Sequence, residues 1–192
     1  MVSLATKRIN HRTTGIVLAM LVLAVNCSAS DTDHIPVVTE FDVTRFLGTW
    51  YEIVRSDHRF ERGLSHVTAT YLEKGPDRIK VINRGFKDQK NNWKESTARG
   101  YLNPESTSGE FAVSFFWPFK ARYRIIELDP EYQYAVVTSN SMDYFWILSR
   151  SMNMGDTQIE EILQRAKKWG FKTDQFIRVE HTEGRHSKSP FK

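Results

Sequence analysis

The side chains best suited to catalysis or metal binding are scattered along this sequence. Asp57 and His58 are adjacent, so on an extended segment their side chains diverge, and we expect a surface pair. There is no G-x-S-x-G, no H-E-x-x-H and no cluster of Cys and His. The sequence therefore predicts no catalytic residue, no metal, no cofactor and no enzyme. The remaining histidines are His11, His34, His66, His181 and His186.

Cys27 is the only cysteine and directly follows an apolar run, Ile16 to Val25, which basic residues precede. This run is shorter than the roughly 20 residues that span a bilayer and is typical of a secretory signal. A cysteine at this point favours lipoprotein processing, in which the thiol of Cys27 is acylated. Asn26 departs from the small residue usual before such a cysteine, so cleavage after Ala29 or Ser30 to give a soluble protein stays open. We predict an export signal over 1–26 and a tether over 27–36.

Gly48, Trp50 and Arg150 have types and positions that suit the closed end of a barrel. Gly48 permits close approach at the start of a strand, and Trp50 would plug the end. Arg150 directly follows the eighth and last strand of the barrel. There its guanidinium can stack on the Trp50 indole and bond nearby carbonyls. Asp143 and Tyr144 stand at the start of that strand. We interpret these residues as structural.

The elements that position these residues are eight short runs of alternating apolar residues, separated by hairpin-length turns. Such spacing without intervening helices predicts an all-β, eight-stranded, antiparallel up-and-down barrel. The expected strands are 49–56, 65–74, 78–86, 93–102, 109–116, 122–129, 132–139 and 143–149.

The hydrophobic period becomes helical over 157–169, where Ile159, Ile162 and Ala166 share one stripe. Thr157 is the expected N-cap, and Gly170 suits the position after the last turn. The stripe must pack on the outside of the barrel. A last strand is expected at 175–180, which ends a barrel domain spanning 37–180, and we expect 181–192 to be a flexible tail.

Alternation along the strands indicates which side chains face the barrel interior. Several of these are small, which favours a cavity lined by aromatic rings over a filled interior, although large residues from other strands would close it. Glu52 is also expected inside, paired with an arginine or among polar groups at the barrel floor. The predicted ligand-binding residues are Val67, Ala69, Tyr71, Val81, Asn83, Ala98, Val113, Phe115, Tyr123, Ile125 and Trp146.

Basic and aromatic residues gather in or beside the loops expected at the open mouth. The cations would attract a phosphate head group, or would simply be a solvated rim. The aromatic residues would gate the mouth, contact a membrane, form a dimer patch or pack over the barrel. The predicted mouth and head-group residues are Arg59, Arg62, Phe116, Trp117, Lys120 and Arg122.

The charge of the chain is mildly basic, with a formal net charge of +4 and a pI near 9.2. Lys and Arg alternate with acidic residues, and no basic run of the kind that follows phosphates is present. We therefore predict no nucleic-acid partner and regard an anionic membrane surface as the more natural one.

The order Gly48-x-Trp50, Asp143-Tyr144 and Arg150 resembles the lipocalin family, although Met142 stands where its Thr-Asp-Tyr element has threonine. Longer stretches, including VTATY, VINRGF, VSFFWPF and DYFWILSR, are similar to its bacterial outer-membrane and apolipoprotein D-like branches over about 37–180. The resemblance implies a calyx that binds a fatty acid or lysophospholipid for membrane maintenance. It also implies an outer-membrane lipid anchor and a possible homodimer, with pocket positions at Tyr71 and Trp146.

Three hypotheses follow. The first is a lipid carrier anchored through Cys27, and the second is a structural outer-membrane protein with a filled barrel. The third is a lipocalin-type enzyme, which needs a reactive Cys or a haem-ligating His inside the calyx. The inward positions hold neither, because alternation places His66 on the outer face. The carrier is favoured.

Overall fold

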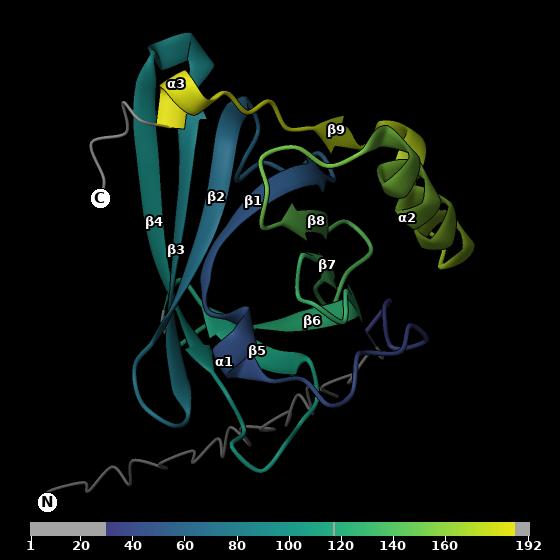
Figure 1. Cartoon of the computed structure of the whole chain (residues 1–192). Coiled ribbons are helices and arrows are strands. Elements are labelled where there is room, and N and C mark those ends of the chain that lie inside the picture. Colours follow the sequence, from purple (N-terminus) through teal and green to yellow (C-terminus); the bar gives the residue numbers. More distant parts are fainter. Residues whose placement is uncertain (1–29, 117, 187–192) are drawn as a thin grey trace, which may run out of the picture.

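The computed structural model describes residues 30–116 and 118–186. Eight strands follow one another as hairpins, and β1 pairs with both β2 and β8, which closes the barrel (Figure 1). The predicted up-and-down barrel is confirmed. Its strands are β1 (Gly48–Arg55), β2 (Leu64–Glu73), β3 (Arg78–Lys87), β4 (Asn92–Tyr101), β5 (Glu110–Ser114), β6 (Ala121–Leu128), β7 (Tyr134–Thr138) and β8 (Phe145–Ser149).

The remaining elements are short except for one helix, α2 (Asp156–Lys168). A ninth strand pairs with the end of β1, beyond the pairing of β1 with β2. Among residues 30–116 and 118–186, no helix is long and apolar enough to cross a membrane. The short elements are α1 (Val43–Phe46), η1 (Asp88–Lys90), η2 (Thr173–Gln175), β9 (Ile177–Arg178) and α3 (Glu183–His186).

Helix α2 lies on the outside of the barrel, away from β2, β3 and β4 (Figure 1). Its buried residues are the predicted stripe, Ile159, Ile162 and Ala166, which pack with outward residues of β1, β7 and β8. The N-cap is Gly155, so the predicted capping role of Thr157 is wrong. The predicted glycine stop is confirmed: Gly170 has φ +99°, and the amides at 170 and 171 bond back to the last turn.

Trp50 closes one end of the barrel and is fully buried. Its indole Nε1 donates to the Phe46 carbonyl at 2.8 Å, and its ring lies under the Arg150 guanidinium at 3.8 Å. Arg150 also donates to the carbonyls of Thr49, Arg45 and Leu47. Gly48 has φ +95°, and a Cβ there would lie 3.3 Å from Arg150. The predicted stacking of Arg150 on the Trp50 indole and its bonds to nearby carbonyls are confirmed.

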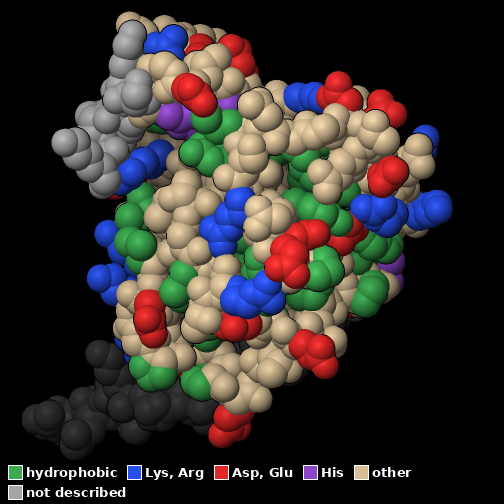
Figure 2. Space-filling view, in the orientation of Figure 1, with side chains coloured by type: hydrophobic (Ala, Val, Ile, Leu, Met, Phe, Trp, Pro, Cys, Tyr) green, Lys and Arg blue, Asp and Glu red, His purple; other side chains and the backbone are tan. Residues whose placement is uncertain are grey.

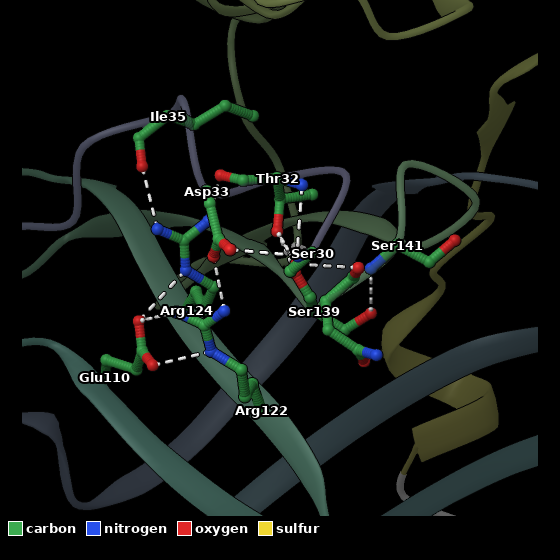
Figure 3. A network of polar contacts seen from close by, with 10 residues as sticks. Ser30, Thr32, Asp33, Ile35, Glu110, Arg122, Arg124, Ser139 and Ser141 are labelled. Atoms are coloured by element: carbon green, nitrogen blue, oxygen red, sulfur yellow. Dashed lines mark hydrogen bonds and ion pairs between the residues drawn. The ribbon is translucent and has the colours of Figure 1, made fainter. Parts of the chain in front are cut away.

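Residues 30–41, here called the N-terminal strap, run along the outside of β6 (Figure 3). The buried Arg124 side chain donates to the carbonyls of Thr32 and Ile35, and Arg122 pairs with Asp33. Thr32 and Ile35 are fully buried. The expectation of a tether is therefore wrong for residues 30–36, because two arginines on β6 bind the backbone and carboxylate of this segment.

Residues 181–186, here called the C-terminal clasp, pack against the outer faces of β2 and β3 (Figure 1). The amide of His66 donates to the Glu180 carbonyl, and the His66 ring bonds Thr182. His181 bonds the Glu52 carbonyl at 2.8 Å. The expectation of a flexible tail is wrong for this part, because its histidines find aromatic and backbone partners. Residues 187–192 lie outside the described part.

Candidate functional site

Three small or polar residues form a row across neighbouring strands inside the barrel. Ala69 of β2 pairs with Asn83 of β3, which pairs with Ser96 of β4. Register places them on the same side as Trp50, which is opposite Ala69 on β1, so all three face inward. They nevertheless keep solvent exposure: Ala69 and Asn83 are partly exposed and Ser96 is exposed. We call these three residues the accessible row.

The accessibility of this row has a structural cause in the short strand β5. It pairs with β4 only from Arg99 to Tyr101, so the wall of the barrel stops beside Ser96. One step toward the closed end, the registered residues Tyr71, Val81 and Ala98 are only 2%, 4% and 1% exposed. Solvent therefore reaches the accessible row through this gap beside β4, whereas Val67 on the mouth side of the row is only 3% exposed.

Aromatic rings fill the barrel between the accessible row and the closed end. Phe46 lies 4.7 Å from Trp50 and 5.0 Å from Tyr71, and Phe111 stacks on Tyr123 at 4.6 Å. The hydroxyls of Tyr71 and Tyr123 are 2.6 Å apart, and burial raises the pKa of both phenols. Both therefore stay neutral at ordinary pH and share one hydrogen bond, which gives this apolar floor a polar spot.

The predicted ligand-binding residues lie on the inward face of the barrel with one exception. Phe115 was predicted inward by alternation, but β5 ends at Ser114 and Phe115 is 46% exposed in the following loop. That prediction is wrong because the pleat stops one residue earlier. The inward residues, whose ligand contacts stay a prediction, are Val67, Ala69, Tyr71, Val81, Asn83, Ala98, Val113, Tyr123, Ile125 and Trp146.

A buried polar cluster lies at the mouth, and simple alternation missed most of it. A β-bulge between Glu52 and Val54 brings both Glu52 and Arg55 to the inner face. Arg55 is 1% exposed and donates to Glu52 at 3.0 Å and to the carbonyls of Glu61 and Leu64. The predicted pairing of Glu52 with an arginine is confirmed. Arg55 thereby holds the β1–β2 loop over the mouth.

Glu61 of this loop is the centre of the cluster. Trp146 donates its indole N–H to Oε2 of Glu61 at 3.1 Å, and Nε2 of His58 lies 3.0 Å from the same oxygen. Burial opposes ionisation of Glu61, but these two partners and Arg55 hold its pKa below the usual value. Burial raises the pKa of Glu52 well above its usual value, and the Glu61 charge adds to this effect. The expected surface pair of Asp57 and His58 is therefore wrong for His58, which is buried against Trp146.

The predicted mouth cations have different partners. Arg62 pairs with Asp57 at 3.0 Å, Arg59 lies over the Phe60 ring, and Lys120 lies over the Tyr101 ring. Arg122 points to the outside of β6, where Glu110 and Asp33 engage it. The head-group role predicted for Arg122 is therefore contradicted by its position and its two acidic partners.

Three phenylalanines of the mouth loops project into solvent. Phe60 is 63% exposed, Phe116 is 78% and Phe119 is 77%.

Contacts join the β1–β2 and β7–β8 loops. The Ser56 hydroxyl donates to the Asp143 carbonyl, and Tyr144 stacks on Trp146. Trp117 and Cys27, predicted for the mouth and for lipidation, lie outside the described residues.

Acidic and basic side chains alternate over the face shown in Figure 2. This agrees with the mixed charge of the sequence, and the displayed face carries no continuous basic stripe.

Comparison with known proteins assigns the chain to a family. The Lipocalin-like domain family matches residues 41–181. The outer membrane lipoprotein Blc of Escherichia coli K12 is 43% identical over 159 residues, which cover 82% of this chain and 90% of the relative. The Blc protein of Vibrio cholerae is 40% identical, covering 77% and 87%. Bovine apolipoprotein D is 35% identical over 128 residues, covering 62% and 65%.

Solved structures show the same fold at low identity. The cockroach allergen Per a 4 superposes with a TM-score of 0.62 at 18% identity, covering 81% of this chain and 99% of that one. Lobster apocrustacyanin A1 gives 0.58 at 19%, covering 73% and 80%. The barrel, the Trp50 plug with its Arg150 cover and the family match over 41–181 agree, and this chain belongs to the lipocalin family.

Proposed function

We propose that this protein carries a single-chain lipid, a fatty acid or a lysophospholipid, in the part of its barrel nearer the mouth. The observation that carries the proposal is the accessible row, where Ala69, Asn83 and Ser96 face inward yet meet solvent. Below it, the Tyr71–Tyr123 pair forms an apolar floor with one polar spot. A single acyl chain suits such a site, because its apolar body can enter while its head stays at the mouth.

The polar cluster at the mouth supports a carrier over a catalyst. Glu52, Arg55 and Glu61 are occupied with one another and with loop carbonyls. They hold the β1–β2 loop in place, and this loop must shift for a long ligand to enter. The cluster therefore fits the role of a gate.

The location we propose is the outer membrane, with Cys27 as the lipid anchor. Support comes from the relatives named outer membrane lipoprotein, which align over most of this chain, and from the apolar run before Cys27. A homodimer stays a prediction, which sedimentation analysis of the purified protein would test.

The test is to fill the accessible row and titrate a fluorescent fatty acid. Ala69→Phe places a ring into the upper interior, and we expect affinity to fall at least about tenfold because a filled pocket excludes the chain. Thr70→Phe is the matched control, because Thr70 is adjacent on β2 and faces outward beside Thr49. If the wild-type protein takes up no fatty acid after delipidation, the carrier proposal fails and a filled structural barrel is favoured. If both variants bind like wild type, the site lies elsewhere.

A further inference from the structure

Three exposed phenylalanines, Phe60, Phe116 and Phe119, project from the connections at the rim of the open end and are here called the rim phenylalanines. They come from two connections at the same end of an up-and-down barrel, β1–β2 and β5–β6. Each is more than 60% exposed. Phe116 and Phe119 lie in one turn, in which the Phe119 amide donates to the Phe116 carbonyl at 2.9 Å, and neighbouring exposed aromatic side chains suit a contact surface.

The N-terminal strap enters the domain at this same end. The Ser30 hydroxyl donates to the Asn140 carbonyl at 2.7 Å, and the Thr32 hydroxyl donates to the Ser139 carbonyl at 2.6 Å. Asn140 and Ser139 belong to the β7–β8 connection, which lies at the mouth with β1–β2 and β5–β6. Arg124 then holds the strap against β6 (Figure 3). The chain is thus fixed beside the mouth from Ser30 onward.

The distance from Cys27 to this fixed point is short. Three residue steps reach at most about 11 Å in an extended chain. An acyl group on Cys27 therefore keeps the membrane surface close to the β7–β8 loop, at the end where the rim phenylalanines project.

The loops at the opposite end of the barrel do not suit an anionic bilayer. The β2–β3, β4–β5 and β6–β7 connections carry Asp77, Glu105, Asp129 and Glu131 with Lys74 as their one base. The four connections at the mouth instead balance their four acids, Asp57, Glu61, Asp88 and Asp143, with four bases, Arg59, Arg62, Lys90 and Lys120, and Arg59 lies over the Phe60 ring. Acidic loops are repelled by anionic lipids, whereas aromatic rings beside cations suit the interface.

We propose that the open end of the barrel docks on the membrane surface through the rim phenylalanines, so that the mouth faces the bilayer. The anchoring half of the argument rests on the proposed function, namely acylation of Cys27. The rim contact does not depend on acylation, because it rests on the exposed rings and on the charges at the two ends of the barrel. In this orientation a lipid passes between bilayer and barrel without crossing open water.

The first test isolates the rim contact from the anchor. The protein used begins at position 27 and carries Cys27→Ser, and all the contacts described above lie within residues 30–186. Sedimentation with vesicles of phosphatidylethanolamine and phosphatidylglycerol measures partition. Phe116→Glu with Phe119→Glu should lower the partition coefficient at least about tenfold, because two apolar contacts become charges at the interface. The matched control is Leu72→Glu, an exposed apolar residue near the closed end.

The second test reads the orientation directly. Because the Cys27→Ser protein has no other cysteine, Phe119→Cys or Leu72→Cys gives a single site for an environment-sensitive fluorophore. The probe at 119 should shift to the blue with vesicles and be quenched by brominated lipid, whereas the probe at 72 should not respond. Equal responses at both positions, or loss of binding in Leu72→Glu alone, would overturn the proposed orientation.

The fluorescent fatty-acid titration in vesicle-free solution separates this inference from the proposed function. A Phe119→Glu variant that binds fatty acid normally but fails on vesicles supports the docking surface. Vesicle binding that depends on the rim in a protein that takes up no fatty acid would overturn the carrier and leave the docking surface standing. Vesicle binding that is unchanged in the rim variants overturns the docking surface alone.

Discussion

The guanidinium of Arg150 covers the indole of Trp50 at 3.8 Å, while three carbonyls around the first strand accept its N–H groups. These residues are 100 positions apart in sequence, yet together they close the barrel. Partial burial lowers the pKa of Arg150, but the group stays charged throughout the accessible pH range. The closed end is thus fixed by a cation–π contact and a set of carbonyl bonds.

Trp50→Ala should destabilise the protein by about 3–5 kcal/mol, the usual cost of removing a buried large aromatic side chain. Urea denaturation followed by circular dichroism measures this free energy of unfolding. A Trp50→Ala protein as stable as wild type would contradict the plug role.

Trp146→Arg should abolish fatty-acid uptake with a modest loss of stability. Trp146 faces inward opposite Arg55, and its ring is partly exposed at the mouth. A second guanidinium there would repel Arg55 and obstruct the acyl chain. Fluorescent fatty-acid titration measures the effect, with Thr97→Arg on the exposed outer face of β4 as the control. Unchanged affinity in Trp146→Arg would place the ligand away from this ring.

Arg124→Ala should cost about 3 kcal/mol of stability, because it leaves buried carbonyls of the strap without their charged donor. Arg122→Ala is the comparison, since Arg122 is more exposed and its ion pairs should contribute less than about 1 kcal/mol. Thermal unfolding of both variants tests the difference. Equal losses would mean that the strap is not held by the buried arginine.

Acidification should release the C-terminal clasp. Burial, with the neighbouring His181 and His66, lowers the pKa of His186 to about 4, and burial also lowers the pKa of His181 and His66. Their neutral forms therefore favour the packed clasp, and this stabilisation is complete above the unfolded pKa of about 6.5. It is lost as the pH falls from 6.5 toward 4. Nearby Glu180 and Asp88 favour protonation of His66, and Arg185 opposes it.

Hydrogen exchange of the His66 amide, which donates to Glu180, reports the clasp directly. Its protection should decline from pH 6.5 to 4 after correction for intrinsic exchange. His186→Gln should weaken this decline, whereas His34→Gln, in the N-terminal strap, should not. Protection that follows global unfolding alone would contradict the mechanism.

The barrel and most inward residues were predictable because alternation and turn residues act locally. Failures occur where a distant partner or a local irregularity decides the outcome. The bulge after Glu52 turns Arg55 inward, which period-two alternation does not signal. Asp33 and Glu110 draw Arg122 away from the mouth, and only tertiary contact joins these residues. Strand β5 ends at Ser114, so Phe115 lies in the following loop, although alternation along the strand predicts that it faces inward.

The packing of the two ends of the domain was also unpredictable, because it depends on partners distant in sequence. The start of the strap, residues 30–34, and the clasp are polar in sequence, which favours disorder when each is read alone. Arg124 and His66 order them by donating hydrogen bonds to backbone carbonyls, Arg124 to Thr32 and Ile35 and the His66 amide to Glu180. The two arginines on β6 and the buried histidine on β2 are visible in the sequence, but their partners are not.

Native mass spectrometry of the mature protein, purified from its own envelope and then extracted to identify lipids, tests the carrier proposal most directly. We predict one fatty acid or lysophospholipid per barrel, lost in Ala69→Phe and retained in Thr70→Phe. A barrel that is empty on purification, and still empty after incubation with membrane lipids, would contradict the account and leave a lipocalin fold with a filled interior.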